Sequence, residues 1–551
     1  MRAIESNVVD VINNRIEKRI VFFGDKIMNA GADVEKTYDF SDYYLLPGLI
    51  DAHIHIESSM LTPDNFSLAA VPHGTTCVVF EPHEIANVCG MRGIDYMLSA
   101  KTPMRMLFTA PSCVPATNME TSGAELGIDE VKDLLSNPRC AGLGEMMNYS
   151  GVIYNDPVVM GKINAAKGMG KVCDGHAPGL SGDQLKKYAA SDISSDHECT
   201  TEQEALEKLK LGMRIMVREG SAAKNLQALA TMANKNYKKC MLVSDDIHAD
   251  ELLSEGHMDR MLRKAVALGI SPVKAVAMAT INAAKYFKLD GLGAIKSGYY
   301  ADFVVVKNLK DFEVVAVFIN GTPVAENGKA MFGAKASGTP KEILVSVRLK
   351  SVGADDLKIA SPKMQNARVI TLVENQIVTN SKTASLESDG KYLIPDLKND
   401  ILPIVVVERH KMTGNVGKGF VAGFGLKEGA LASTVAHDSH NIICVGANYG
   451  DMECAISELK RMGGGLAAVK NGKIVERLEL PIAGLMSDKS AEIVAGKTKD
   501  VNAAAKSLGS ALSAPFATLS FLALPVIPSL KLTDKGLVDV NQFKFVDLIT
   551  G

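Results

Sequence analysis

Three features are missing from this sequence, and each absence excludes a class of function. There is no run of about 18 apolar residues that could cross a bilayer. Lys and Arg total 60 against 63 Asp and Glu, so no basic surplus is available to hold a nucleic-acid backbone. The nine cysteines include no Cys-x-x-Cys pair and are odd in number, which favours reduced thiols over a disulfide framework. We therefore expect a small-molecule substrate, with no membrane or nucleic acid as partner.

The N-terminus and the length set the next expectations. Arg2 and Glu5 carry charge where a secretory signal would have its apolar stretch, so we predict a cytoplasmic protein. A chain of 551 residues is too long for one hydrophobic core, and two or three domains are the default expectation.

Short β-rich runs alternate with helical patterns between residues 45 and 290. This alternation is typical of a parallel sheet with crossover helices. A capping box at Thr201–Glu204 begins one of these helices. Eight such units predict an α/β fold, a (β/α)8 barrel of the TIM type. The predicted strands are Leu45–His55, Thr75–Glu81, Met104–Pro111, Cys140–Met146, Lys171–His176, Asp192–His197, Arg214–Glu219 and Cys240–Asp245.

The segments on either side of the barrel predict two further parts. Residues 291–335 have the pattern of short strands joined by turns, and they could pair with the strand-like Arg19–Phe23. A small composite β-sandwich from residues 1–44 and 291–335 would result. Residues 340–551 remain globular in composition and predict a C-terminal α/β domain.

His53 and His55 lie at the end of the first predicted barrel strand. Residues i and i+2 of a strand point to the same face, so the two imidazoles can reach one metal ion while Ile54 faces away. A lone His-x-His pair is weak evidence, because surface or hydrogen-bonded histidines have the same spacing. In a barrel of this type, however, functional side chains come from the C-terminal ends of all strands.

Four other predicted strand ends carry residues that bind metals. They are Glu145, His176, His197 and Asp245. With His53 and His55 they make a set that fits two divalent ions bridged by a carboxylate and a hydroxide better than one ion. Glu145 is the natural bridge, because each of its two oxygens can take one metal. Asp245 is preferred over Asp246 as a ligand, and the alternative is that Asp245 only caps the next helix.

The sequence resembles the amidohydrolase superfamily and, within it, the bacterial adenine deaminase family. Similarity extends over nearly the whole chain, although the stretch before the first barrel strand is short. The segments that carry it are Pro47-Gly-Leu-Ile-Asp-Ala-His-Ile-His-Ile-Glu-Ser-Ser, Glu81-Pro-His-Glu-Ile-Ala-Asn-Val, Gly144-Glu-Met-Met-Asn, Asp174-Gly-His-Ala-Pro-Gly, Ser195-Asp-His-Glu, Ser244-Asp-Asp, Arg409-His-Lys-Met-Thr-Gly-Asn, Ala436-His-Asp-Ser-His-Asn and Leu480-Pro-Ile-Ala-Gly-Leu-Met-Ser.

The resemblance implies hydrolysis of adenine to hypoxanthine and ammonia in purine salvage. It also implies two ions per chain, Mn(II) or Fe(II) in preference to Zn(II), and a homodimer. Glutamate takes the bridging place that a carboxylated lysine often has in other amidohydrolases. A hydroxide made by the metals would attack C6 of the purine, and Asp245 would carry its proton to the leaving amine.

Further polar residues are predicted to belong to this site. Glu81, His83 and Glu84 follow the second strand, where they could protonate a ring nitrogen, orient a ligand or stabilise the loop. We place His83 and Glu84 with the catalytic groups, and we expect Glu81, Glu219 and Ser221 to bind the purine. His437 and His440 are spaced like ligands on a helix. They are expected to be structural or interfacial unless the third domain closes over the pocket.

Three alternatives compete with this interpretation. Zinc-dependent nucleobase deaminases with His-x-Glu also need Pro-Cys-x-x-Cys, and only His55-Ile-Glu57 is present. A cyclic-amide hydrolase of the dihydropyrimidinase or dihydroorotase type is the enzymatic alternative, but a glutamate replaces its lysine at position 145. A catalytically inactive barrel serving as a scaffold would not be expected to keep every ligand position filled.

Overall fold

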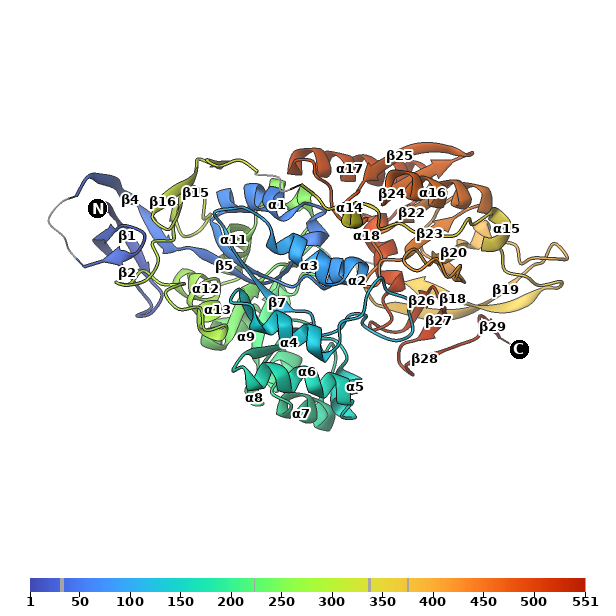
Figure 1. The fold of residues 1–551 in the computed structure, drawn as a ribbon, viewed down its shortest axis with the longest axis horizontal. Helices are drawn as coiled ribbons and strands as arrows, with labels where there is room; N and C mark the ends of the chain where they lie inside the picture. Colours follow the sequence, from blue (N-terminus) through green and yellow to red (C-terminus); the bar gives the residue numbers. More distant parts are fainter. Residues whose placement is uncertain (30–33, 222, 335–337, 374–375, 551) are drawn as a thin grey trace.

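The computed structural model describes residues 1–29, 34–221, 223–334, 338–373 and 376–550. Figure 1 shows three parts side by side along the long axis, with the barrel in the middle. The N-terminal strands form one end with the olive strands that follow the barrel. The orange and red C-terminal domain forms the other end.

The middle part is a closed ring of parallel strands. Its members are β5 (Leu49–His55), β6 (Thr75–Phe80), β7 (Arg105–Ala110), β8 (Cys140–Met146), β9 (Val172–Gly175), β10 (Ser195–Asp196), β11 (Arg214–Arg218) and β12 (Cys240–Val243). Strands β5 to β9 and strands β10 to β12 form two parallel sheets, and a bridge between Cys173 and Ile193 links them. The ring closes where β13 (Asp245–Asp246) pairs with β5. The predicted (β/α)8 barrel is therefore confirmed.

Helices follow the strands and cover the ring. They are α1 (Pro63–Ala70), α2 (His83–Cys89), α3 (Met91–Leu98), α4 (Ile128–Ser136), α5 (Tyr149–Ile153), α6 (Pro157–Gly168), α7 (Gly182–Ala190), α8 (Glu202–Lys210), α9 (Leu226–Lys235), α10 (Ala249–Glu255), α11 (Met258–Ala267), α12 (Pro272–Met278) and α13 (Ile281–Tyr286). At the start of α8 the Thr201 hydroxyl accepts a hydrogen bond from the Glu204 amide at 3.3 Å, which is the predicted cap.

Two predicted strands are divided in the structure. The run Leu45–His55 splits at Gly48, so its first residues end β4 (Lys36–Pro47) in the small β domain and the rest form β5. A Cβ atom at Gly48 would lie 2.2 Å from the Thr76 hydroxyl oxygen, so the Thr76 side chain leaves no room for one there. The last barrel strand breaks before Asp245, whose φ of 59° leaves the extended region.

The two flanks of the barrel build one continuous sheet. Its order is β17 (Lys329–Ala330), β16 (Thr322–Glu326), β15 (Val314–Ile319), β14 (Phe303–Val306), β4, β1 (Arg2–Asp10), β2 (Arg15–Phe23) and β3 (Ile27–Met28). Phe23 on β2 and Phe318 on β15 have ring centroids 6.1 Å apart, although three strands separate β2 from β15 in this order. The sheet therefore curls over an apolar core, as expected for a composite sandwich.

The C-terminal domain is a long mixed sheet with helices against it. The sheet runs β19 (Thr379–Leu386), β18 (Gln365–Leu372), β21 (Val416–Ala422), β20 (Ile401–Val407), β23 (Ile442–Gly446), β22 (Ala430–Ser433), β24 (Gly465–Lys470) and β25 (Lys473–Glu479), with β29 (Ile549–Thr550) beside β18. Its helices are α16 (Tyr449–Met462), α17 (Ala491–Ser507) and α18 (Pro515–Ser520). Short α14 (Lys341–Leu344) and α15 (Ala354–Leu357) precede it, and β26 (Leu530–Thr533), β27 (Gly536–Asp539) and β28 (Lys544–Phe545) form a separate sheet.

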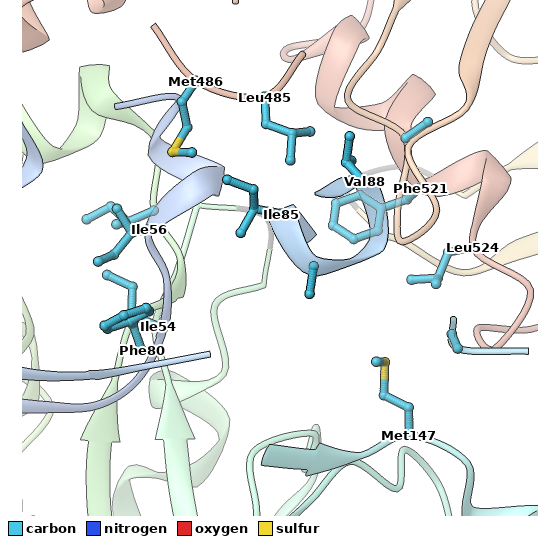
Figure 2. Packing of buried hydrophobic residues seen from close by; sticks show 14 of the residues in the cluster. Ile54, Ile56, Phe80, Ile85, Val88, Met147, Leu485, Met486, Phe521 and Leu524 are labelled. Atoms are coloured by element: carbon cyan, nitrogen blue, oxygen red, sulfur yellow. The ribbon is translucent and has the colours of Figure 1, made fainter. Parts of the chain in front are cut away.

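The barrel and the C-terminal domain share one apolar core. Figure 2 shows Ile85 and Val88 of α2 close to Leu485 and Phe521 of the C-terminal domain. All four are buried, Ile85 completely. Since α2 follows β6 at the C-terminal end of the barrel, this contact places the domain over the end where the strand-end residues gather. No helix in the described ranges is long and apolar enough to cross a membrane.

Candidate active site

His53 and His55 are held so that each presents an unprotonated nitrogen to the centre of the barrel. Nδ1 of His55 lies 3.1 Å from the backbone carbonyl of Glu81, which can only accept, so this nitrogen carries the proton. Nδ1 of His53 faces the carboxylate oxygen Oδ2 of Asp174 at 2.9 Å, which favours the proton on this nitrogen. Both Nε2 atoms then point lone pairs at Asp245 Oδ1, 3.3 Å from each.

Glu145 at the end of β8 lies between two groups of histidines. Its Oε1 is 3.2 Å from His55 Nε2, whereas its Oε2 is 2.6 Å from His176 Nδ1 and 3.1 Å from His197 Nε2. The backbone amide of Glu145 donates to Glu81 Oε2 at 2.8 Å. A Cβ atom at Gly144 would lie 2.3 Å from Glu81 Oε1, so only a glycine at this position lets the Glu81 carboxylate reach the Glu145 amide.

These donors fit a pair of divalent cations. Nε2 of His53 is buried and has no hydrogen-bond partner in the described part of the chain. A lone pair that faces a carboxylate without a proton between them is repulsive, and a cation between them removes the repulsion. His53 and His55 can surround one position with Glu145, and Glu145, His176 and His197 can surround a second; Asp245 joins His53 and His197 in a further group of the same kind. All are nitrogen and oxygen donors, with no thiolate among them.

The charges around these ligands keep both carboxylates ionised. Burial acts to raise the pKa of Glu145, but the neighbouring His176 and His197 outweigh it and hold that pKa well below its usual range. Burial is likewise outweighed at Asp245, chiefly by Arg218, so its pKa also lies well below the usual range. Both carboxylates are therefore ionised and available as ligands.

Arg218 and Glu198 belong to the site but were not among the predicted residues. Arg218 Nη1 donates to Asp245 Oδ2 at 2.9 Å, and its Nη2 donates to Glu198 Oε2 at 3.0 Å. Both side chains line the same cavity as His176. The available signals were that Arg218 ends β11 and that Glu198 directly follows His197.

His83 and Glu84 lie beside the metal-type cluster and line its cavity. Nδ1 of His83 is 3.4 Å from Glu145 Oε1, and its Nε2 is 3.5 Å from Glu84 Oε1. His83, the first residue of α2, thus lies between Glu145 of the barrel and Glu84 of the same helix. Glu84 makes its own contacts with the C-terminal domain.

The C-terminal domain completes the cavity. His437 Nδ1 is 2.7 Å from Glu84 Oε1, and His440 Nε2 bonds the other oxygen of the same carboxylate. The ring of His437 stacks on Phe521 with centroids 4.4 Å apart. The domain thus closes over the pocket and brings both histidines to it, in a turn and not on a helix. Its residues that line the cavity are Ile377, His437, Asp438, Phe521, Leu524 and Ile527.

Four remaining residues from the sequence prediction take different places. Glu81 supports Glu145 from behind and does not face the cavity. Glu219 accepts from the Leu226 amide at 3.1 Å and pairs with Lys264, while Ser221 donates to Glu251 at 3.0 Å. Neither is among the described residues that line the cavity. Asp246 lines it, but accepts from Ser58 at 2.5 Å, and Asp245 is the residue among the histidines.

Comparison with known proteins agrees with the barrel and its histidine-carboxylate cluster. The model of the amidohydrolase family matches residues 44–324, so this is an amidohydrolase. The model of the adenine deaminase C-terminal domain matches residues 376–544.

Full-length relatives narrow the family. An adenine deaminase of Dehalococcoides mccartyi is 47% identical over 549 residues, which cover 98% of this chain and 95% of the relative. The adenine deaminase of Desulfatibacillum aliphaticivorans is 47% identical, and the match covers 98% of this chain and 96% of the relative. That of Methanothermobacter thermautotrophicus is 48% identical, and the match covers 93% of each chain. The chain belongs to the adenine deaminase family.

Proposed function

We propose that this protein hydrolyses adenine to hypoxanthine and ammonia, using two divalent metal ions. Family membership supplies the reaction, and the position of Glu145 carries the two-ion part of the proposal. Its two oxygens face different histidine groups, which is what a bridging carboxylate must do. His53, His55, Glu145 and Asp245 would hold one ion, and Glu145, His176 and His197 the other.

The nitrogen and oxygen donors suit Mn(II) or Fe(II) and are compatible with Zn(II). Ions held by these residues would lower the pKa of a bound water and so provide the nucleophile for C6. The same donors give no advantage to softer ions, because none of the described ligand groups contains a cysteine.

Asp245 is the proposed proton carrier. It is ionised, it lies within 3.3 Å of both His53 and His55, and Arg218 holds its second oxygen. A carboxylate fixed in this way can accept the proton of the attacking water and return it to the 6-amino group, which leaves as ammonia.

His83 is the proposed donor to the purine ring. Attack at C6 moves an electron pair onto the adjacent ring nitrogen, which must then gain a proton. His83 lines the cavity between Glu145 and Glu84, and Glu84 is itself fixed by two histidines. Glu84 therefore orients His83 and supports its charged form.

Location, oligomeric state and metabolic role are proposed from the family. We propose a cytoplasmic homodimer that works in purine salvage, supported by the family resemblance and by the prevalence of twofold symmetry among oligomers. Light scattering of the purified protein tests the dimer.

Ammonia release from adenine tests the function. The protein is stripped of metal, reloaded with Mn(II) and incubated with adenine, while hypoxanthine and ammonia are measured. Equal amounts of both products are expected, and none without metal. A cyclic imide such as dihydrouracil serves as the competing substrate. Turnover of dihydrouracil without turnover of adenine would reject the proposal in favour of a cyclic-amide hydrolase.

A further inference from the structure

Asp438 of the C-terminal domain is a buried carboxylate with an unused oxygen in the substrate cavity. The residue lies in the turn between β22 and β23, lines the cavity beside His437, and is only 3% exposed. Its Oδ2 has no hydrogen-bond partner among the residues that the structure describes. The nearby Ser439 hydroxyl and Glu120 Oε1 also lack partners, so neither satisfies it. A buried acceptor in this state requires a donor from elsewhere.

The position of Asp438 identifies which part of a substrate could be that donor. His83 faces Glu145 with Nδ1 at 3.4 Å and faces Asp438 Oδ1 with Nε2 at 3.8 Å. These nitrogens are on different sides of the imidazole ring, so His83 stands between Asp438 and Glu145. The 6-amino group must be at the Glu145 end, where the attacking water would form.

Free adenine has only one other donor, the N–H of its five-membered ring. A nucleoside lacks it, because the sugar replaces that hydrogen and the remaining ring nitrogen is an acceptor. The C-terminal domain also lines the cavity with Phe521, Leu524 and Ile527, whose side chains have no donor. Nδ1 of His437 is 3.9 Å from Asp438 Oδ1, but it lies closer to Glu84, at 2.7 Å.

We propose that Asp438 accepts a hydrogen bond from the five-membered-ring N–H of adenine and so selects the free base over the nucleoside. The inference rests on the proposed deamination of adenine. Selection follows because a bound nucleoside would leave the Asp438 carboxylate buried and unpaired, and sites built around a hydrogen bond reject ligands that lack it far more strongly than apolar pockets do.

Steady-state kinetics with three Mn-loaded variants test this role. Asp438→Ala should raise the KM for adenine by about tenfold to a hundredfold, the range for a lost hydrogen bond to a charged group, with a smaller change in kcat. Asp438→Asn, which keeps the shape and one acceptor oxygen, should lie between Asp438→Ala and wild type. Ser439→Ala removes a neighbouring hydroxyl that is not in the cavity wall and should match wild type.

Inhibition by 9-methyladenine, which lacks the ring N–H, gives the decisive readout. The ratio of its inhibition constant to the KM for adenine should be large in wild type and should fall by about tenfold in Asp438→Ala, because no carboxylate is then left unpaired. An unchanged ratio and KM in both Asp438 variants, with two metals retained and adenine turned over by wild type, would overturn this inference alone. A wild type that does not turn over adenine would overturn the proposed function and this inference together.

Discussion

Two clusters in this molecule have the same composition and opposite chemistry. Glu145 lies between His176 and His197, and Glu84 lies between His437 and His440. In both clusters the ligand atoms are within 4.8 Å of one another, close enough to surround an ion. Distance therefore does not separate them.

The two clusters differ in which imidazole nitrogen carries the proton. Nδ1 of His55 donates to a backbone carbonyl, which leaves a bare lone pair facing Glu145. In the other cluster the Ala436 amide donates to His440 Nδ1 at 3.1 Å, so the proton is on Nε2 and points at Glu84. His176 and His437 contact their glutamates alike, at 2.6 and 2.7 Å. The difference lies at His55 and His440: the lone pair of His55 is open to a cation, whereas His440 uses its proton on Glu84. The partner of the second ring nitrogen decides what a histidine can bind.

Glu145→Gln should have the largest effect on this contrast. An amide cannot bridge two cations as a carboxylate does, so both ions and all measurable deamination should be lost while the fold stays. The loss should exceed the about 10- to 100-fold typical of an outer partner. Metal analysis, circular dichroism and ammonia release check the three parts. Full activity with two bound ions would remove Glu145 from the bridge.

Asp174→Asn tests whether the tautomer of His53 matters. Asparagine can present an N–H to His53 Nδ1, which would put the imidazole proton on Nε2, where the metal should bind. We expect metal affinity to fall about 10- to 100-fold, measured by competition with a chelator, with activity restored by excess Mn(II). Equal affinities in variant and wild type would contradict the assignment.

Glu84→Gln should leave the metal content at two ions per chain and reduce stability. Losing charged hydrogen bonds to His437 and His440 should lower the free energy of unfolding by about 1.5–3 kcal/mol. A denaturant titration of wild type and variant measures the difference. A drop in metal content with Glu84→Gln would mean that the second cluster also holds an ion.

The pH dependence of this difference has a definite sign. Burial acts to raise the pKa of Glu84, but His437, His440 and His83 outweigh it and hold the pKa well below its ordinary value of 4.5. A depressed pKa stabilises the fold above the unfolded value and loses that contribution as the pH falls towards the folded value. The gap between wild type and Glu84→Gln should shrink below about pH 5. It should also shrink at alkaline pH, because Glu84 raises the pKa of His437 from 6.5 to about 9 and His437 loses its charge there.

Ser221→Ala should have the smallest effect. Ser221 donates to Glu251, outside the cavity wall, so kcat and KM for adenine should stay within about twofold of wild type. A large rise in KM would instead restore Ser221 to the purine-binding residues.

Local patterns in the sequence were enough to predict the barrel and the residues on the barrel side of the pocket. His53, His55, Glu145, His176 and His197 each end a strand, and the barrel geometry brings strand ends together. The preference for Asp245 over Asp246 was a judgement, because it depends on a φ of 59° that no spacing reveals.

The other side of the pocket depends on contacts between distant parts of the chain. His437 and His440 reach Glu84 across 353 and 356 residues, and only the docking of the domains makes that contact. Arg218 was not predicted, because arginine is not a metal-binding residue type. Its guanidinium instead holds the ligand Asp245 in place.

The roof of the cavity has a consequence for the rate of the reaction. The cavity beneath it has a volume of about 40 Å³, room for a few water molecules. Side chains that line this cavity, Phe521 and Leu524 among them, would have to shift to admit a purine. A tighter interface between the barrel and the C-terminal domain would increase stability and slow turnover, so stability and catalytic rate oppose each other at this interface.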